Sequence, residues 1–441
     1  MENAGFIATI GCIAVLVLML MRVPIAICLG AVSIIGSAWM IGWEPAIALL
    51  IDKPIRTVTN FEFSVIPMFI LMGTLVSVSG MSRELFRAAH AWVGHLPGGL
   101  AISTVLACGG FAAINGSSLA SAATMTQVAL PEMRRIGYNP GFASGVIAAG
   151  GTIGIMIPPS VMFILYAIIT ESDIASLFIA GILPGLLAIS LYCITVQIVY
   201  MMYPEWMPKA EKASWQERKD SLKDIWAVFL LLFSVLAAIY GGLTTITEAA
   251  GFGVIGALVI GVARGRLSWK QIVEALIESL RTSAALFFIL IGAFLFQSFL
   301  AYTQTPQAIG EFLTGLNIGA MGIILMIVVF YIIAGMFVDG IAVVLLTVPI
   351  FHAVVSGDTA MGGLGMSEIW FGVIVVTTVE IGLISPPIGM ICFVMNKMVP
   401  DIGLSNIFKG VTPFIISDIV RLGLLLAFPA ISLVLVNAMG H

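Results

Sequence analysis

Long apolar runs, rather than an alternation of apolar and polar positions, fill most of this 441-residue chain. A helix needs about 20 mostly apolar residues to cross the hydrocarbon core of a bilayer. Ten segments approach or exceed that length, at residues 5–21, 24–50, 65–81, 142–170, 176–203, 224–241, 246–263, 283–301, 368–398 and 410–438. The pattern predicts an all-α integral membrane protein with about ten transmembrane helices.

Composition agrees with this prediction. The chain is 60% hydrophobic and 10% charged, whereas a soluble domain is about 45–50% apolar and about 25% charged. The first segment follows no Lys or Arg and precedes no small-residue cleavage site, so we expect a retained helix rather than a signal peptide. The five cysteines lack metal-ligand spacing, and the net charge of −4 does not indicate a nucleic-acid partner. We therefore expect no cofactor and no nucleic acid.

Internal repeats divide the chain into two related halves. GGTIGIMIPPSVMF at 150–163 resembles EIGLISPPIGMICF at 380–393, with the same spacing from glycine to a double proline. FILMG at 69–73 likewise matches FILIG at 288–292, and SAATMTQVALP at 121–131 matches DGIAVVLLTVP at 339–349. We predict one repeat at 1–203 and a second at 225–441. A solvated linker with an amphipathic helix, residues 204–224, joins them.

Basic residues indicate how the two halves are oriented, because short cytoplasmic loops are enriched in Lys and Arg. The linker and the segment 264–281 are basic and are predicted to be cytoplasmic, which places both termini in the periplasm. Arg134 and Arg135 lie in the first-half turn at 131–140, but the equivalent second-half segment at 349–368 has no Lys or Arg. Equivalent loops on opposite sides indicate inverted repeats. Lys53 and Arg56 are exceptions to this scheme.

Two further segments are predicted to be re-entrant helical hairpins. Residues 99–131 turn at NGSS (115–118), and residues 318–351 turn at FVDG (337–340). The arms of the first hairpin, about 12 to 16 residues each, are too short to span a bilayer. Non-helical backbone at membrane depth is tolerated only where protein or a water-filled cavity surrounds it. We therefore expect the two tips and the two glycine–proline breaks to meet near the membrane midplane.

The breaks in 142–170 and 368–398 carry the candidate chemistry. Proline cannot continue the backbone hydrogen-bond ladder, so each break frees carbonyl and N–H groups. Carbonyls and hydroxyls are ligands for a hard cation, and the N-termini of half-helices favour an anion. The alternative is that each proline only kinks its helix. Two copies at equivalent positions, each facing a polar hairpin tip, favour a binding site.

Ionisable side chains inside the membrane are functional candidates because they are costly to bury. On the predicted topology only Asp339 and Glu380 lie in the interior, and no Lys or Arg lies equally deep. Hydrogen bonds to freed backbone amides are the structural alternative for both acids. Hydroxyl groups are available from Ser117, Ser118, Ser121, Thr124, Thr152, Thr377, Thr378 and Ser385, although each can instead bond to its own helix.

Five motifs together resemble the large membrane subunit (the M or DctM subunit) of tripartite ATP-independent periplasmic (TRAP) transporters. They are NGSSLASAATM, GGTIGIMIPPS, GMFVDGIAVVLLTVPI, TVEIGLISPPIGM and GGLTTITEAAG. The resemblance covers essentially the whole chain. It departs at Ile246, where the family usually has proline. It implies an elevator-type fold of the ion transporter superfamily and sodium-coupled uptake of an organic acid such as a C4-dicarboxylate or sialic acid.

The same resemblance implies partners and binding residues. The partners are a small four-helix membrane subunit (Q) and a soluble periplasmic substrate-binding protein (P), and the location is the bacterial inner membrane. A first sodium site would involve Asn115, Gly116, Ser117 and Ser118 with Gly150, Gly151, Thr152 and Gly154. A second would involve Gly335, Asp339 and Gly340 with Thr377, Thr378, Glu380 and Gly382. Substrate would lie near Ser121, Thr124, Pro158, Ser385 and Pro386.

Three alternatives to a TRAP transporter subunit predict different properties. A stand-alone sodium/dicarboxylate symporter or a cation antiporter of the same architecture would not need a binding protein. An intramembrane protease could use Asp339 and Glu380 as paired acids, but the chain has no paired-aspartate, Ser-His or His-x-x-x-His arrangement at helical spacing. We therefore expect a protein that is not an enzyme. A channel would show flux that neither saturates nor requires a partner.

Overall fold

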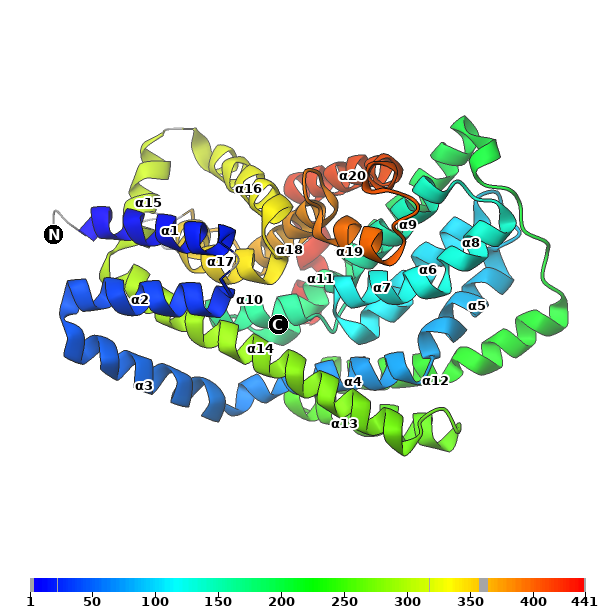
Figure 1. Cartoon of the computed structure of the whole chain (residues 1–441), viewed down its shortest axis with the longest axis horizontal. Helices are drawn as coiled ribbons and strands as arrows, with labels where there is room; N and C mark the ends of the chain where they lie inside the picture. The colour runs from blue at the N-terminus through cyan, green and yellow to red at the C-terminus, as the bar shows by residue number, and fades with distance from the viewer. Residues whose placement is uncertain (1–3, 22, 317, 357–363, 440–441) are drawn as a thin grey trace.

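The computed structural model describes residues 4–21, 23–316, 318–356 and 364–439, so part of the predicted loop at 349–368 lies outside the described residues. Every regular element within those ranges is a helix (Figure 1). Among the described residues, seven helices are long and apolar enough to cross a bilayer: Phe61–Val78 (η1 with α4), α11 (Ile174–Met202), α12 (Trp215–Tyr240), α13 (Ile246–Ala263), α14 (Trp269–Tyr302), α16 (Gly319–Phe337) and α20 (Leu404–Ala427). The prediction of an all-α membrane fold is confirmed.

The remaining elements are shorter helices, several of which account for other expected spans. They are α1 (Ala4–Leu20), α2 (Ile25–Ile41), α3 (Trp43–Thr59), α5 (Met81–Val93), α6 (Gly99–Asn115), α7 (Ser118–Val128), α8 (Leu130–Ile136), α9 (Pro140–Thr152), η2 (Ile153–Ile155), α10 (Val161–Thr170), η3 (Pro204–Trp206), α15 (Thr305–Gly315), α17 (Gly340–Ser356), α18 (Glu368–Ile384), α19 (Met390–Met398) and α21 (Ala430–Met439).

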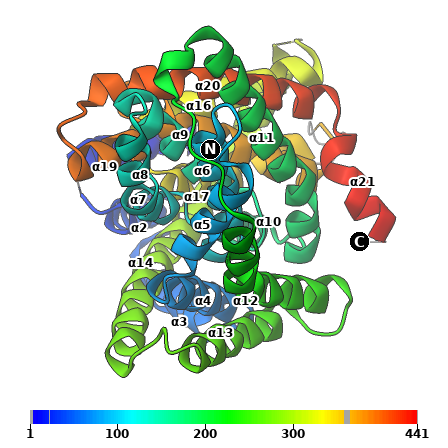
Figure 2. The same cartoon turned by 90° about the vertical axis from the view of Figure 1, so that its right-hand side faces the viewer.

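The helices form two groups that Figure 2 shows one above the other. The scaffold group, at the bottom of that view, contains α3, α4, α12, α13 and α14, and α2 packs against α14. The hairpin group above it contains the two hairpins, the two broken helices, α11 and α20. The N-terminal end of α12 also contacts α5, which connects α4 of the scaffold group to α6 of the hairpin group.

Two predicted spans are each divided into two helices. The segment 24–50 turns at Gly42, whose φ of +91° suits glycine, and α3 follows. Lys53 and Arg56 therefore lie within a helix that is polar on one side, not in a loop. The segment 410–438 is interrupted at Pro429, which has no N–H to continue the hydrogen-bond ladder of α20.

Three scaffold helices begin with the same local device, a capping box in which two residues exchange side-chain and backbone hydrogen bonds. Ser214 with Glu217 starts α12, Thr245 with Glu248 starts α13, and Ser268 with Gln271 starts α14. Because of these starts, the predicted linker ends in the first turns of α12, and most of the predicted loop 264–281 is helical. Ile246 occupies the first helical position of α13, so the capping box sets the start without the family's proline.

Both predicted hairpins are present, and they enter the molecule from opposite ends (Figure 1). The first consists of α6 and α7, which turn at Gly116 and Ser117, and the second consists of α16 and α17, which turn at Val338 and Asp339. The expectation of short arms holds only in part: α7 has 11 residues, but α16 has 19 and is long enough to span. The turn, rather than arm length, defines the second hairpin.

Both broken helices are also confirmed. The first runs through α9, η2 and α10, and the second through α18 and α19, with the double prolines in the interruptions. Both Pro–Pro peptide bonds are cis. The two breaks differ in their surroundings, because Pro158 and Pro159 are buried whereas Pro386 and Pro387 are exposed. The second break therefore lies at the surface of this chain.

Candidate functional site

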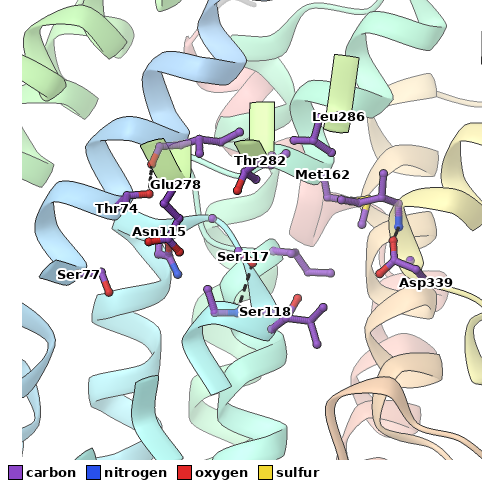
Figure 3. A pocket seen from close by; sticks show the side chains of 18 of the residues that line it. Thr74, Ser77, Asn115, Ser117, Ser118, Met162, Glu278, Thr282, Leu286 and Asp339 are labelled. Carbon is purple, nitrogen blue, oxygen red and sulfur yellow. Dashed lines mark hydrogen bonds between the residues drawn. The ribbon is translucent and has the colours of Figure 1, made fainter. Parts of the chain in front are cut away.

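A cavity of about 250 Å³ lies where the two hairpin tips meet the scaffold group (Figure 3). The first tip contributes residues 115–120, the second contributes residues 339–341, and α4 and α14 close the scaffold side. None of the lining residues is Lys or Arg. The polar lining consists of Thr74, Ser77, Asn115, Ser117, Ser118, Glu278, Thr282 and Asp339. Six predicted ion-binding residues thus share this cavity: Asn115, Gly116, Ser117, Ser118, Asp339 and Gly340.

The first tip packs directly on the first break. Gly116 has a φ of +60°, and a Cβ placed on it would lie 2.9 Å from the carbonyl oxygen of Pro159. A Cβ on Gly154 would lie 3.3 Å from both the carbonyl oxygen of Ser117 and the hydroxyl of Ser121. The missing side chain at Gly116 permits this close approach of two backbones, and Gly154 leaves room for the tip beside it. The expected meeting of tip and break is therefore observed at these residues.

Two polar groups at this contact lack hydrogen-bond partners within the described part of the chain. They are Nδ2 of Asn115 and the hydroxyl of Ser121, which is completely buried. Buried polar groups are nearly always paired, so an unpaired one at a tip needs an explanation. Thr152 behaves differently, because its hydroxyl donates to the carbonyl of Ala149 at 2.7 Å. Gly150 and Gly151 pack on the hairpin arms, against Cys108 and Ala122.

The second tip packs on the second broken helix through glycines. A Cβ on Gly382 would lie 2.7 Å from the Cα of Gly335, and a Cβ on Gly340 would lie 2.6 Å from a methyl of Val379. The structure therefore brings Gly335, Gly340 and Gly382 together as predicted. The hydroxyls of Thr377 and Thr378 instead donate to carbonyls of their own helix, at 2.8 to 2.9 Å.

Asp339 has both of the roles considered from the sequence, because it bonds to a backbone amide and also lines the cavity. Its Oδ2 accepts a hydrogen bond from the backbone N–H of Ile341 at 3.1 Å, and its carbonyl accepts the first helical bond from Val343. It thus caps the N-terminus of α17. It also lines the cavity, on the side opposite Asn115 and Glu278 (Figure 3). Asp339 is therefore both a helix cap and a polar group in the lining of the cavity.

The expectation that no cation lies near the interior acids is wrong. Arg421 on α20 is 1% exposed, and its Nη2 donates to Oε2 of Glu380 at 2.6 Å. The same nitrogen lies 3.1 Å from Oδ1 of Asp418, a third buried acid that the sequence argument missed. Val379 and Gly382 take the hairpin-facing side of α18, which directs Glu380 toward α20. Glu380 is therefore held by an ion pair rather than facing the tip.

The five residues predicted to bind substrate are not gathered in one cavity, and none of them lines the cavity between the tips. Ser121 and Pro158 are buried at the first break, Thr124 is half-buried on α7, and Pro386 is exposed. The hydroxyl of Ser385 donates to the carbonyl of Ile381 at 2.6 Å. The repeat pattern located the breaks but not the direction in which each residue points.

Sequence reasoning missed the scaffold side of the cavity. Thr74 and Ser77 follow the FILMG motif on α4, and Glu278 and Thr282 precede its FILIG counterpart on α14. The matching motifs were the available signal, because polar residues beside both copies mark equivalent helices at the same depth. Asp418 and Arg421 carried a signal too, since they lie three residues apart inside a predicted span.

An all-helical membrane domain whose broken helices and hairpin tips surround a cavity with hydroxyl, amide and carboxylate groups in its lining is the architecture of a secondary transporter. The family model described as "Tripartite ATP-independent periplasmic transporter, DctM component" matches residues 12–431. The chain belongs to this family, and it is a multi-pass transporter component rather than an enzyme. The family implies a small membrane subunit and a periplasmic binding protein as partners.

Individual relatives agree with the family match. A C4-dicarboxylate TRAP transporter large permease protein of Pseudomonas aeruginosa is 34% identical over 391 residues, covering 88% of this chain and 89% of the relative. An ectoine TRAP transporter large permease protein of Halomonas elongata is 31% identical and covers 95% of this chain and 96% of the relative. The crystal structure of the YdaH transporter of Alcanivorax borkumensis is similar in fold alone, with a TM-score of 0.62, 13% identity, and coverage of 88% of this chain and 89% of that one.

Proposed function

We propose that this chain is the large transmembrane subunit of a sodium-coupled TRAP transporter that imports an organic acid delivered by a periplasmic substrate-binding protein. The observation that carries the proposal is the cavity between the tips, because its polar lining consists of hydroxyl, amide and carboxylate groups without Lys or Arg. Oxygen atoms of these kinds are ligands that suit a hard cation. The family membership supports transport, and the cavity chemistry supports sodium.

The first proposed sodium site lies at the first tip. The backbone of Asn115 to Ser118 and the carbonyls at the end of α9, including Gly150 to Thr152, supply oxygen ligands. The unpaired hydroxyl of Ser121 adds a further oxygen at the same contact. A bound cation there would satisfy a buried hydroxyl that otherwise has no partner in the described chain.

The second proposed site lies at the second tip, between Gly335, Asp339 and Gly340 and the carbonyls of Thr377, Thr378 and Gly382. Asp339 supplies the negative charge, because Glu380 is already engaged by Arg421. Glu380 would then act on this site through the position of α18. The two sites lie on opposite sides of the cavity.

Substrate is proposed to bind in the cavity itself. An anionic group would be held by the hydroxyls of Ser117, Ser118 and Thr282 and by the bound sodium ions, since the lining offers no cationic side chain. The relatives named for a C4-dicarboxylate and for ectoine indicate that the family architecture accepts different small solutes. The substrate class proposed here is therefore an organic acid without further specification.

The proposed transporter complex includes a small subunit, lies in a membrane and moves during transport. The small four-helix subunit would cover the lipid-facing side of the scaffold group, where α13 exposes Phe252, Ile255 and Val259. The complex would lie in the bacterial inner membrane, with the basic linker in the cytoplasm and both termini in the periplasm. The hairpin group would move against the scaffold group as an elevator, which carries the cavity between the two membrane faces.

Reconstituted transport tests this function. Proteoliposomes that contain the chain and its small subunit are expected to accumulate a carboxylate substrate only with the matching binding protein and an inward sodium gradient. The measurement is uptake of labelled candidate acids at fixed pH, with choline or potassium replacing external sodium. Equal uptake in all three salts would disprove sodium coupling, and full uptake without the binding protein would favour a stand-alone symporter.

Asp339→Asn is expected to weaken sodium binding while retaining the shape and hydrogen-bonding reach of the side chain. Loss of a charge-assisted contact costs about 1 to 3 kcal/mol, so the sodium concentration for half-maximal uptake should rise and high external sodium should restore part of the rate. Asp339→Ala should also lower the melting temperature, because it removes the cap of α17. An Asn variant with the parent's sodium dependence would leave Asp339 as a cap alone.

A further inference from the structure

A continuous chain of buried polar contacts connects the two broken helices. It begins at Thr152 in the last turn of α9, whose hydroxyl lies 3.3 Å from the phenol oxygen of Tyr192 on α11 and can donate to it as well as to the carbonyl of Ala149. The Tyr192 phenol donates to Oδ2 of Asp418 on α20 at 2.7 Å. Arg421 then pairs with both Asp418 and Glu380, and Glu380 lies on α18 just before the second break. Four helices thus meet through five side chains.

The members of this chain, here called the polar bridge (Thr152, Tyr192, Asp418, Arg421 and Glu380), are all buried to within 1% of complete. Two carboxyl groups share one guanidinium, so both depend on Arg421 for compensation of their charge. Removing one partner from such a buried pair leaves an uncompensated charge in a low-dielectric interior. The bridge therefore resists any change in which one broken helix moves relative to the other.

The bridge also has groups that are not used within the described residues. Oε1 of Glu380 and the Nε and Nη1 groups of Arg421 have no hydrogen-bond partner there. A guanidinium with unused donors and a carboxylate with an unused acceptor can exchange contacts without leaving the network. Individual contacts can therefore exchange while the bridge continues to connect α9 and α18.

We propose that Tyr192, Asp418 and Arg421 are positioning residues that couple ion occupancy at the first break to ion occupancy at the second. This inference rests on the proposed sodium sites, because Thr152 and Glu380 adjoin the carbonyls assigned to them. An ion bound at the first break fixes the position of the C-terminal end of α9, and this in turn fixes the position of the Thr152 hydroxyl. The bridge transmits that position through Tyr192 and Arg421 to α18, so the second ion binds a helix already in place.

The direct test is Tyr192→Phe, which retains the ring and its edge-to-face contact with Phe414, at 5.4 Å between centroids, but removes the bridging hydroxyl. With coupling intact, sodium binding to the two sites of the purified protein gives a Hill coefficient that approaches about 2, whereas uncoupled sites give about 1 or less. We expect the variant's sodium binding, measured by titration calorimetry, to show a Hill coefficient near 1 or below, and its uptake to need a half-saturating sodium concentration roughly 5-fold higher or more. Tyr240→Phe is the matched control, because the buried Tyr240 hydroxyl on scaffold helix α12 has no partner among the described residues.

Thr152→Val repeats the test from the other end, since it breaks the 3.3 Å contact and leaves the bond from Tyr192 to Asp418 in place. If Tyr192→Phe does not fold, Thr152→Val tests the coupling of the two ion sites by the same measurement. A sodium curve identical to the parent's in the folded variant would overturn the coupling role while sodium-dependent transport remains. If the parent itself transports without sodium, the proposed function fails first and the coupling role fails with it.

Discussion

Replacement of Arg421 by methionine is expected to destabilise the folded protein by about 3 to 5 kcal/mol, the usual cost of removing one partner from a buried ion pair. Arg421 lies between Glu380 and Asp418, all three are buried, and no Lys or other Arg is paired with either acid in the described residues. Methionine fills a similar volume but leaves two acids without a counter-charge. The expected result is a much lower melting temperature in detergent and poor recovery of folded protein.

Two comparisons separate charge loss from general damage. Arg56→Met removes an exposed pair with Asp52 on α3 and should change the melting temperature little, because exposed ion pairs contribute about 0 to 1 kcal/mol. Combining Arg421→Met with Glu380→Gln and Asp418→Asn should recover much of the lost stability, since no buried charge remains. A single Arg421→Met variant as stable as the parent would contradict the ion-pair geometry.

Gly410→Ala is expected to disturb the hairpin group strongly, because α20 and α9 are in backbone contact at this position. A Cβ on Gly410 would overlap the carbonyl of Gly141, and a Cβ on Gly145 would overlap the carbonyl of Gly410. Both obstacles are backbone and cannot rotate away. Overpacking of this kind costs about 1 to 3 kcal/mol, and the shift of α20 would also displace Asp418 and Arg421.

Measurement of melting temperature and uptake rate for Gly410→Ala checks this expectation. Gly423→Ala lies on the same helix, but no atom beyond the adjacent turns of its own helix backbone lies within 4 Å of the added methyl. That control should keep the parent's transport rate and match or slightly exceed its stability, because alanine favours the helix more than glycine does. Equal behaviour of the two variants would show that α9 and α20 are not closely packed.

The elements that the sequence predicted best are those with a strong local cause. Pro158–Pro159 and Pro386–Pro387 cannot sit inside a regular helix, so both breaks were predictable to within a few residues. The turn near Gly116 was predictable for a similar reason, because a small polar run interrupts an apolar segment. Each of these features depends on the chain's own backbone and not on a distant partner.

Features that depend on tertiary neighbours were harder to predict. Arg421 was overlooked because one charged residue changes the mean hydropathy of a long apolar window very little, although a buried partner determines its role. Glu380 was placed at the second break correctly, but the repeat pattern relates backbone positions and does not show which face of α18 meets the hairpin. The roles of Thr282 and Glu278 depend on how α14 packs beside the two hairpin tips at the cavity, which no local pattern reveals.

The capping boxes that start α12, α13 and α14 have a consequence for biogenesis. Each of these long spans carries its own start signal within four residues, from Ser214, Thr245 and Ser268 respectively. Helix nucleation is the costly step, and a cap that satisfies the first N–H groups locally reduces that cost. During synthesis, these three helices can therefore form and enter the membrane before the ribosome has made the second hairpin that will later rest against α14.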